Sequence, residues 1–456
     1  MTDTPLWAET ALLPQGWADG VRVGLKHGRI ASVDAAPAQP GDRRIGCLLP
    51  APVNLHSHAF QRAMAGMTER RGAGKQDSFW TWRTLMYRFL DHLTPDDVQA
   101  IAAFVQMEML EAGYAGVAEF HYLHHQPGGA PYAALSEMAD RIVAAAGDTG
   151  IGLTLLPVAY ERGGCDGRGL TTGQLRFGND ADRFFRLYEG AVQSVAALAP
   201  DAVCGVAPHS LRAVSAQSLA LLAAHAPGAP IHMHIAEQVA EVAEVQAAYG
   251  ARPVEWLLAN VPVDARWCLI HATQMEPHET KGLALSGAVV GLCPITESNL
   301  GDGIFDGLRW PAAGGVWGVG SDSNVRISLS EELRSYEYSQ RLQNKGRAMI
   351  AGADRSTGRA LFEGAVRGGA QAAGRDAGAI AVGKWADLMA LDRGAVDLEG
   401  RVGDGILDAW IFAGDDRMVC DVWSAGRHVV RAGRHLARDG IEAGYRRVMA
   451  RLVGLL

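Results

Sequence analysis

The stretch Asn54-Leu55-His56-Ser57-His58 decides the fold and the site that this sequence predicts. It continues an apolar run with two prolines, residues 48–53, which is typical of a buried strand. Residues two apart in a strand share a face, so His56 and His58 should lie side by side at one strand end. Neutral imidazole is the commonest metal ligand. The pair alone is a weak indication, because His-x-His arises by chance in many chains.

The composition is that of an ordinary globular protein. The 456 residues are 48% hydrophobic and 20% charged, and this length exceeds one ordinary domain. The net charge is −8 without a long run of Lys or Arg, which argues against nucleic-acid or membrane-surface partners. No apolar run approaches the roughly 20 residues that span a bilayer. The six cysteines form no Cys-x-x-Cys pair and residues 1–5 show no secretory signal, so we expect a cytoplasmic protein.

Apolar runs that alternate with helix-like stretches predict the fold class. Eight strands are expected, at residues 48–58, 116–122, 152–160, 203–209, 230–237, 267–273, 288–295 and 316–322. A helix should begin at Pro95 after Thr94 as N-cap and end near Gly113. This pattern predicts a (β/α)8 TIM-like barrel, with a doubly wound open sheet as the alternative. No Gly-x-Gly-x-x-Gly follows the first strand, which counts mildly against a dinucleotide fold.

The two ends of the chain look β-rich and are expected to form one small β-sandwich. Residues 21–33 should form a hairpin that turns near Gly28, and a hairpin alone is too small to bury a core. Further strands are expected at residues 387–392, 409–412 and 419–423. The expected units are residues 1–47 and 375–456 for the sandwich and residues 48–374 for the barrel.

Polar residues follow the apolar runs at the strand ends, where barrel enzymes hold their active sites. The residues at successive strand ends are His56 and His58, Glu119 and His121, His209, His234 and Glu237, His271, and Asp322. Any one of these histidines is more often structural than a ligand, and Asp322 also suits a turn. Chance alone would rarely place so many histidines and carboxylates at corresponding strand ends.

Four of these side chains can supply a catalytic zinc site: His56, His58, His234 and Asp322. Zinc takes three or more nitrogen or oxygen ligands and leaves one position for water, whose pKa it lowers toward about 7. Iron or manganese also fits such a set. His232 shares a face with His234 and competes for the ligand role. We favour His234, because it lies nearer the C-terminal end of the strand and its spacing to Glu237 suits a shared site.

Glu237, His271 and Asp322 are the predicted catalytic groups. Glu237 lies just past a strand end, where its carboxylate can move a proton between water and substrate. His271 can donate a hydrogen bond to a developing tetrahedral centre or orient the water. Asp322 would assist the proton transfer and also bind the metal.

In combination these motifs resemble the amidohydrolase superfamily. The matching positions are residues 54–58, His234 and Glu237, His271, Asp322, and residues 383–388. The resemblance covers nearly the whole chain and implies a barrel with a split β-sandwich. No lysine ends the fourth strand, where His209 stands instead. That difference favours the mononuclear, deaminase-like branch over the binuclear hydrolases.

Several stretches resemble the formimidoylglutamate deiminases of that superfamily more closely. They are residues 58–66, 78–83, 119–122, 207–212, 293–303 and 320–324. The resemblance implies zinc-dependent hydrolysis of N-formimidoyl-L-glutamate to N-formyl-L-glutamate and ammonia, in histidine degradation, by a homodimer with one zinc ion per subunit. It also implies that the substrate is contacted by Gln61, Arg83, Tyr122, His209 and Arg212.

The implied substrate carries two carboxylates and a cationic formimidoyl group. Arg83 and Arg212 offer planar guanidinium groups that suit carboxylates, although either arginine could instead form a surface or interdomain salt bridge. Two other functions stay open: a deaminase of a guanine-like or other amino-heterocycle, and a barrel without catalysis that serves as a scaffold. Whether the Gly-rich residues 66–80 close over the substrate is also open.

Overall fold

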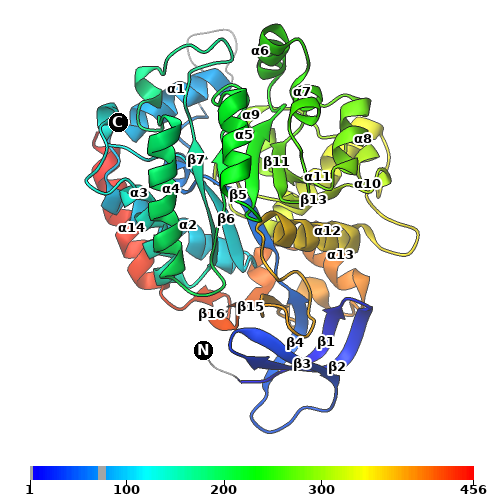
Figure 1. Cartoon of the computed structure of the whole chain (residues 1–456). Coiled ribbons are helices and arrows are strands. Elements are labelled where there is room, and N and C mark those ends of the chain that lie inside the picture. The colour runs from blue at the N-terminus through cyan, green and yellow to red at the C-terminus, as the bar shows by residue number, and fades with distance from the viewer. Residues whose placement is uncertain (1–3, 70–78, 456) are drawn as a thin grey trace.

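The computed structural model describes residues 4–69 and 79–455, so most of the loop at residues 66–80 lies outside the described part. Parallel strands form its centre (Figure 1). They are β5 (Val53–Ser57), β6 (Gly116–His121), β7 (Gly152–Ala159), β8 (Val203–Cys204), β9 (Ala207–Pro208), β10 (Ile231–Ile235), β11 (Trp267–His271), β12 (Val289–Leu292) and β13 (Val316–Val319). Each of the eight apolar runs therefore contains a barrel strand, as predicted, but residues 48–50 of the first run end a separate strand, Arg43–Pro50, in another sheet.

These strands form two parallel sets, β5 to β9 and β10 to β13, which adjoin at both edges. Parallel bridges pair Ser57 with Asp322 and Val206 with Ile231. The fourth strand is split because Val206 turns from β7 to β10: its N–H donates to Pro230 O (3.0 Å) and its carbonyl accepts from His232 N (3.1 Å). The predicted (β/α)8 barrel is confirmed.

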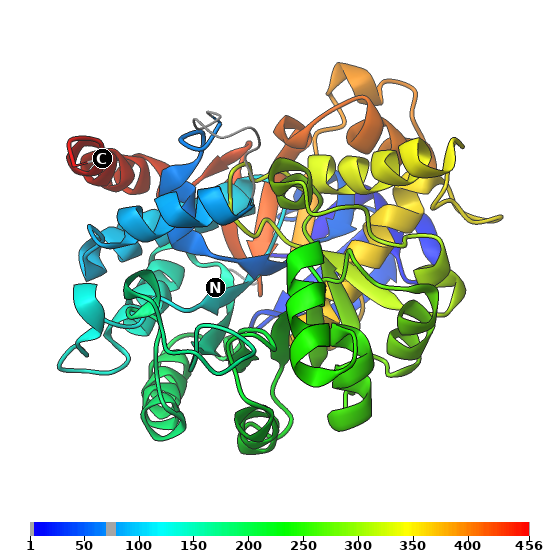
Figure 2. The same ribbon diagram turned by 90° about the horizontal axis from the view of Figure 1, so that it is seen from above.

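Helices surround the strands (Figure 2). They are η1 (Ala59–Met64), α1 (Phe79–Leu90), α2 (Pro95–Glu111), α3 (Glu137–Thr149), α4 (Ala181–Ala196), α5 (Ala216–His225), α6 (Val239–Tyr249), α7 (Pro253–Asn260), α8 (Pro277–Leu285), α9 (Pro294–Leu300), α10 (Arg309–Ala312), α11 (Leu329–Asn344) and α12 (Thr357–Ala372). The predicted start of α2 is confirmed, since Thr94 and Asp97 form a capping box there. None of the described helices combines the length and the apolar character needed to cross a bilayer.

The two ends of the chain form one unit below the barrel in Figure 1, as predicted. Its strands are β1 (Leu6–Leu13), β2 (Gly16–Lys26), β3 (Arg29–Ala35), β4 (Arg43–Pro50), β14 (Leu388–Leu391), β15 (Val419–Ser424), β16 (Arg427–Arg431) and β17 (Arg434–His435). They make one continuous sheet in the order β17-β16-β15-β14-β4-β1-β2-β3. The predicted hairpin is β2 with β3, and β4 beside β14 joins the two ends of the chain.

The prediction that residues 409–412 form a strand is wrong. They end α13 (Asp404–Phe412), in which Ile406, Leu407 and Trp410 recur at helical spacing and are buried. The C-terminal segment also supplies α14 (Arg438–Val453), which lies along α2 (Figure 1) and forms ion pairs from Arg438 to Glu111 and from Arg451 to Asp97. A four-residue apolar run cannot distinguish a strand from a buried helix segment by periodicity.

A buried ion network joins the barrel to the sheet. Arg375, just after α12, pairs with Asp387 at the start of β14 (Nε to Oδ2, 2.5 Å) and with Asp201 before β8 (Nη2 to Oδ2, 2.8 Å). Arg427 of β16 also pairs with Asp201 (Nη1 to Oδ1, 2.6 Å). Burial would raise the pKa of Asp201, but the two guanidinium groups hold that pKa below its usual value.

We expect R375L to lower the free energy of unfolding by about 3–5 kcal/mol, because it leaves the buried Asp387 without its guanidinium partner and Asp201 with Arg427 alone. Urea unfolding followed by circular dichroism measures this change. The matched control is R417L, which breaks the exposed pair between Arg417 and Asp415 and should leave the unfolding midpoint unchanged. Equal midpoints for R375L and the unmodified protein would contradict the stabilising role of the network.

Candidate active site

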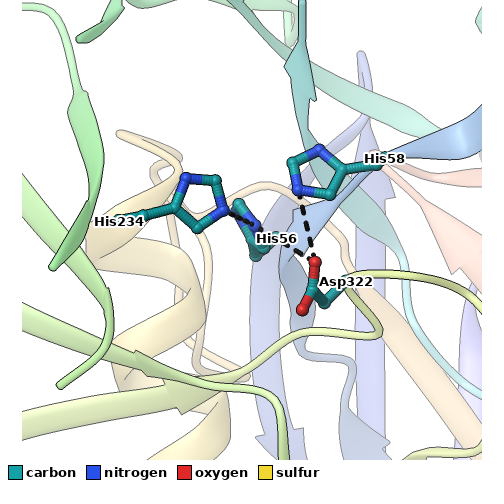
Figure 3. A group of neighbouring side chains, drawn as sticks. All are labelled: His56, His58, His234 and Asp322. Carbon is teal, nitrogen blue, oxygen red and sulfur yellow. Dashed lines mark hydrogen bonds and ion pairs between the residues drawn. The ribbon is translucent and has the colours of Figure 1, made fainter. Parts of the chain in front are cut away.

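Four predicted side chains converge at the C-terminal ends of the barrel strands (Figure 3). His56 and His58 come from β5 and the turn after it, His234 from β10, and Asp322 from the turn after β13. All four are between 0% and 6% exposed. The Nε2 atoms of His56 and His234 lie 3.1 Å apart, and Asp322 Oδ1 lies 3.5 Å and 3.3 Å from Nε2 of His56 and of His58.

Backbone carbonyls orient two of these imidazoles so that Nε2 faces the cluster. His58 Nδ1 lies 3.0 Å from Phe120 O, and His234 Nδ1 lies 3.2 Å from His209 O. Because a carbonyl only accepts, Nδ1 carries the proton in both rings and Nε2 presents a lone pair. Burial lowers the pKa of all three histidines, which keeps them neutral. Converging lone pairs beside a carboxylate repel one another unless a cation lies between them, so this donor set fits a metal ion.

His232 does not reach this cluster. Its Nε2 lies 2.7 Å from the carbonyl oxygen of Ala372 at the end of α12, one layer below His234. The structure thus brings His234 to the other candidate ligands and gives His232 a contact that secures α12 against the barrel.

The turn that carries Asp322 is pressed against β5. Asn54 donates to Ser321 Oγ (2.6 Å) and accepts from Ser321 N (3.1 Å), while Asp322 N donates to His56 O (2.9 Å). A Cβ at Gly320 would meet His56 N at 2.6 Å, so glycine permits this close approach. Asp322 has a φ of 46° and His271 a φ of 71°, a backbone strain that is typical of functional sites.

Glu237 and His271 lie on the open side of the cluster. His271 Nε2 lies 4.0 Å from Glu237 Oε1 and 3.7 Å from Asp322 Oδ2. Burial raises the pKa of Glu237 to about 7, although the nearby His271 opposes this. Burial alone would lower the pKa of His271, but the surrounding carboxylates, Glu237 first, raise that pKa well above its usual value. A carboxylate with a pKa near 7 is suited to accept and return a proton at neutral pH.

A cavity of about 570 Å³, which includes its open mouth, lies above these groups. All five predicted substrate residues line it: Gln61, Arg83, Tyr122, His209 and Arg212. Gln61 donates to Tyr122 Oη (2.7 Å), and its buried Oε1 has no hydrogen-bond partner among the described residues. Arg212 is 7% exposed and forms no salt bridge within the described part of the chain. The alternative prediction, that Arg212 forms a surface or interdomain salt bridge, is therefore not met among these residues. Arg83 donates to Tyr160 Oη (3.0 Å).

Two carboxylates beside the site were not assigned a role from the sequence. Glu119 Oε1 accepts from Ala59 N (2.7 Å), which fixes the turn after His58, and burial raises its pKa to about 8. Glu297 Oε1 lies 3.2 Å from His271 Nδ1. The sequence pattern places Glu119 at a strand end and Glu297 within the family-like stretch 293–303. It does not indicate that Glu119 contacts Ala59 or that Glu297 contacts His271.

Residues 47–429 match the amidohydrolase family. The chain belongs to this family. Residues 4–46 match the N-terminal domain of formimidoylglutamate deiminase HutF. Its family and its buried group of three histidines and an aspartate, which fits a metal ion, make this chain a metal-dependent hydrolase and not a scaffold.

Known amidohydrolases extend the comparison over nearly the whole chain. A formimidoylglutamate deiminase from Pseudomonas aeruginosa is 47% identical over 98% of this chain and 99% of its own. A 5-methylthioadenosine/S-adenosylhomocysteine deaminase from Halobacterium salinarum is 29% identical over 86% and 85%. The crystal structure of an amidohydrolase from Brucella melitensis has a TM-score of 0.95 and 50% identity, covering 98% and 99%. A zinc-bound adenosine deaminase from Xanthomonas campestris, with a TM-score of 0.82, 22% identity and 99% coverage of both chains, shares the fold.

Proposed function

We propose that this amidohydrolase hydrolyses N-formimidoyl-L-glutamate to N-formyl-L-glutamate and ammonia, a step of histidine degradation. The observation that carries the proposal is one cavity that joins the ligand cluster, Glu237 with His271, and the guanidinium groups of Arg83 and Arg212. The two guanidinium groups suit the carboxylates of a dicarboxylate substrate, and Glu237 with His271 suits the proton transfers that accompany the loss of ammonia. The deiminase from Pseudomonas aeruginosa, 47% identical over 98% of the chain, supports the same substrate.

The metal is proposed to be zinc, held by His56, His58, His234 and Asp322. Held by these three imidazoles and this carboxylate, zinc would acidify a water molecule and so supply the nucleophile at neutral pH. The imidazole-rich set favours zinc, while iron or manganese would be distinguished by metal analysis.

Glu237 is proposed to carry the proton. Its carboxylate accepts a proton from the attacking water as the new C–O bond forms on the formimidoyl carbon. It then returns the proton to the terminal nitrogen, so that the C–N bond breaks and the formyl C=O forms. The remaining hydroxyl proton passes to the departing ammonia, which leaves as ammonium. His271 and Asp322 lie beside this path and stabilise the tetrahedral centre, His271 by donating from Nε2.

The two carboxylates of the substrate are proposed to bind Arg83 and Arg212. Each guanidinium can donate two parallel hydrogen bonds to one carboxylate. Gln61, Tyr122 and His209 complete the wall between the arginines and the ligand cluster. The unpartnered Oε1 of Gln61 can accept a hydrogen bond from a substrate N–H.

We expect R212M to raise KM for formimidoylglutamate about 100-fold, since a pair of charge-assisted hydrogen bonds contributes about 3 kcal/mol. The smaller effect should be on kcat, because the arginine is proposed to bind a carboxylate of the substrate and not the reacting carbon. Steady-state kinetics measure both constants. R309M, which removes an exposed arginine of α10, should match the unmodified protein. An unchanged KM in R212M would remove Arg212 from substrate binding.

Ammonia release tests the substrate directly. The protein should release ammonia from formimidoylglutamate, lose this activity on chelation and regain it with zinc. The competing substrates are 5-methylthioadenosine, S-adenosylhomocysteine and guanine, which represent the amino-heterocycles. Faster turnover of any of these would replace the proposed substrate and leave the family assignment in place.

We also propose a homodimer in the cytoplasm, without nucleic-acid or membrane partners. The net charge of −8 and six cysteines without a disulfide in the described part of the chain support the compartment and the absence of these partners. The homodimer rests on the family resemblance. One chain has a mass of 48.5 kDa, and light scattering coupled to size exclusion should give about twice that mass. The mass of a single chain would contradict the dimer.

A further inference from the structure

The strand end after β12 had no assigned role in the site. β12 leads through Cys293 into α9, and Glu297 on this helix is 6% exposed. Its Oε1 accepts a hydrogen bond from Cys293 N (2.8 Å) and lies 3.2 Å from His271 Nδ1 on the neighbouring strand end. One carboxylate oxygen thus contacts the start of its own helix and the ring of a catalytic candidate.

This contact fixes how His271 presents its other nitrogen. A carboxylate accepts, so Nδ1 of His271 carries the proton on the side of Glu297. The ring is then oriented with Nε2 toward Glu237 Oε1 (4.0 Å) and Asp322 Oδ2 (3.7 Å). A ring rotated by a half turn would lose the Glu297 contact and place a carbon atom toward the two carboxylates.

A second contact links the same helix to Asp322. Thr296 Oγ1 lies 2.9 Å from Ser323 Oγ and accepts from Ser323 N (3.3 Å). It also lies within hydrogen-bond distance of Ser321 O (3.3 Å). The residues on both sides of Asp322 therefore bind α9, so consecutive side chains of one helix contact the two segments that carry His271 and Asp322.

We propose that Glu297 is a positioning residue that holds His271 in its working orientation, and this rests on the proposed function. Glu297 itself does not line the cavity, so it acts through His271 and not on the substrate. The negative charge of Glu297 also stabilises positive charge on His271 when that ring donates from Nε2.

The competing explanation is that Glu297 only braces the first turn of α9. Glu332 on α11 provides the matched control, because its Oε2 accepts from Ile295 N (2.9 Å) in that same turn. Glu332 is fully buried and has no hydrogen bond or ion pair with His271 among the described residues. A variant at Glu332 therefore disturbs the helix turn without removing the contact to His271.

The test compares E297Q, E332Q, H271N and the double variant E297Q/H271N by kcat, KM and bound metal. We expect E297Q to lower kcat about 10- to 100-fold with KM within about threefold and unchanged metal content. E332Q should stay near the unmodified protein. In the H271N background, E297Q should lower kcat no further, since a residue that acts through His271 has nothing left to position.

Three results would overturn the proposal: unchanged kcat in E297Q, equal losses in E297Q and E332Q, or independent losses that multiply in the double variant. If E297Q folds poorly, E297D keeps the charge and should retain more kcat than E297A at equal thermal stability; equal kcat in these two would also overturn it. All variants are assayed with the substrate that the unmodified protein turns over fastest. A failure to release ammonia from formimidoylglutamate then removes the proposed substrate without affecting this comparison.

Discussion

E237Q lowers kcat for formimidoylglutamate by about 10³-fold and retains the bound metal, because the amide cannot accept the proton of the attacking water. Gln keeps nearly the volume of Glu, and the ligand cluster of His56, His58, His234 and Asp322 does not include this side chain. The loss should therefore appear in kcat, with KM little changed. Steady-state kinetics and metal analysis of the same preparation measure the two parts of the prediction.

The matched control is E189Q, an exposed glutamate of α4 that should leave both kcat and metal content unchanged. If E237Q retained more than a tenth of the activity, another group would have to move the proton. If E237Q lost the metal, the lost activity would reflect the empty site and not the missing carboxylate.

H234A should lose most of the bound metal and at least about 100-fold of the activity, because even partners of metal ligands change affinity 10- to 100-fold. The counterpart on the same strand is H232Q. His232 lies two residues before His234 and contacts Ala372 O, and the side-chain amide nitrogen of Gln can make the same contact. We expect H232Q to keep the metal and most of the activity and to lower only the thermal stability.

Metal analysis after dialysis against a weak chelator, followed by the ammonia assay, distinguishes the two histidines. Loss of metal in H232Q with retention in H234A would reverse the ligand assignment. Added zinc at high concentration should partly rescue H234A, since three ligands remain.

The barrel and the convergence of the candidate ligands could be predicted because both depend on local pattern. Each apolar run reports a strand, and parallel strands in a barrel bring their C-terminal ends to one rim. His56, His234 and Asp322 therefore meet although they are far apart in sequence. The helix start at Thr94 was predictable for the same reason, since a capping box depends on four consecutive residues.

The features that could not be predicted depend on contacts between distant segments. Glu297 reaches His271 only because Cys293 and Pro294 turn the chain at the end of β12. Arg375 forms ion pairs with Asp201 of the barrel and with Asp387 of the terminal sheet, which are far apart in sequence. The same holds for residues 409–412, where packing of the apolar side chains and not their short-range pattern selects a helix.

The continuous sheet below the barrel sets an order of events during synthesis. β4 pairs with β14, so one edge of β4 has no strand partner until nearly the whole chain has left the ribosome. Ala51 and Pro52 alone separate β4 from β5, the strand that carries His56. β4 can pair with β1 and β5 with β6 early in synthesis, but the second edge of β4 stays open until β14 has been made. A chain that stops before residue 388 would therefore expose an unpaired edge two residues before the strand that carries His56.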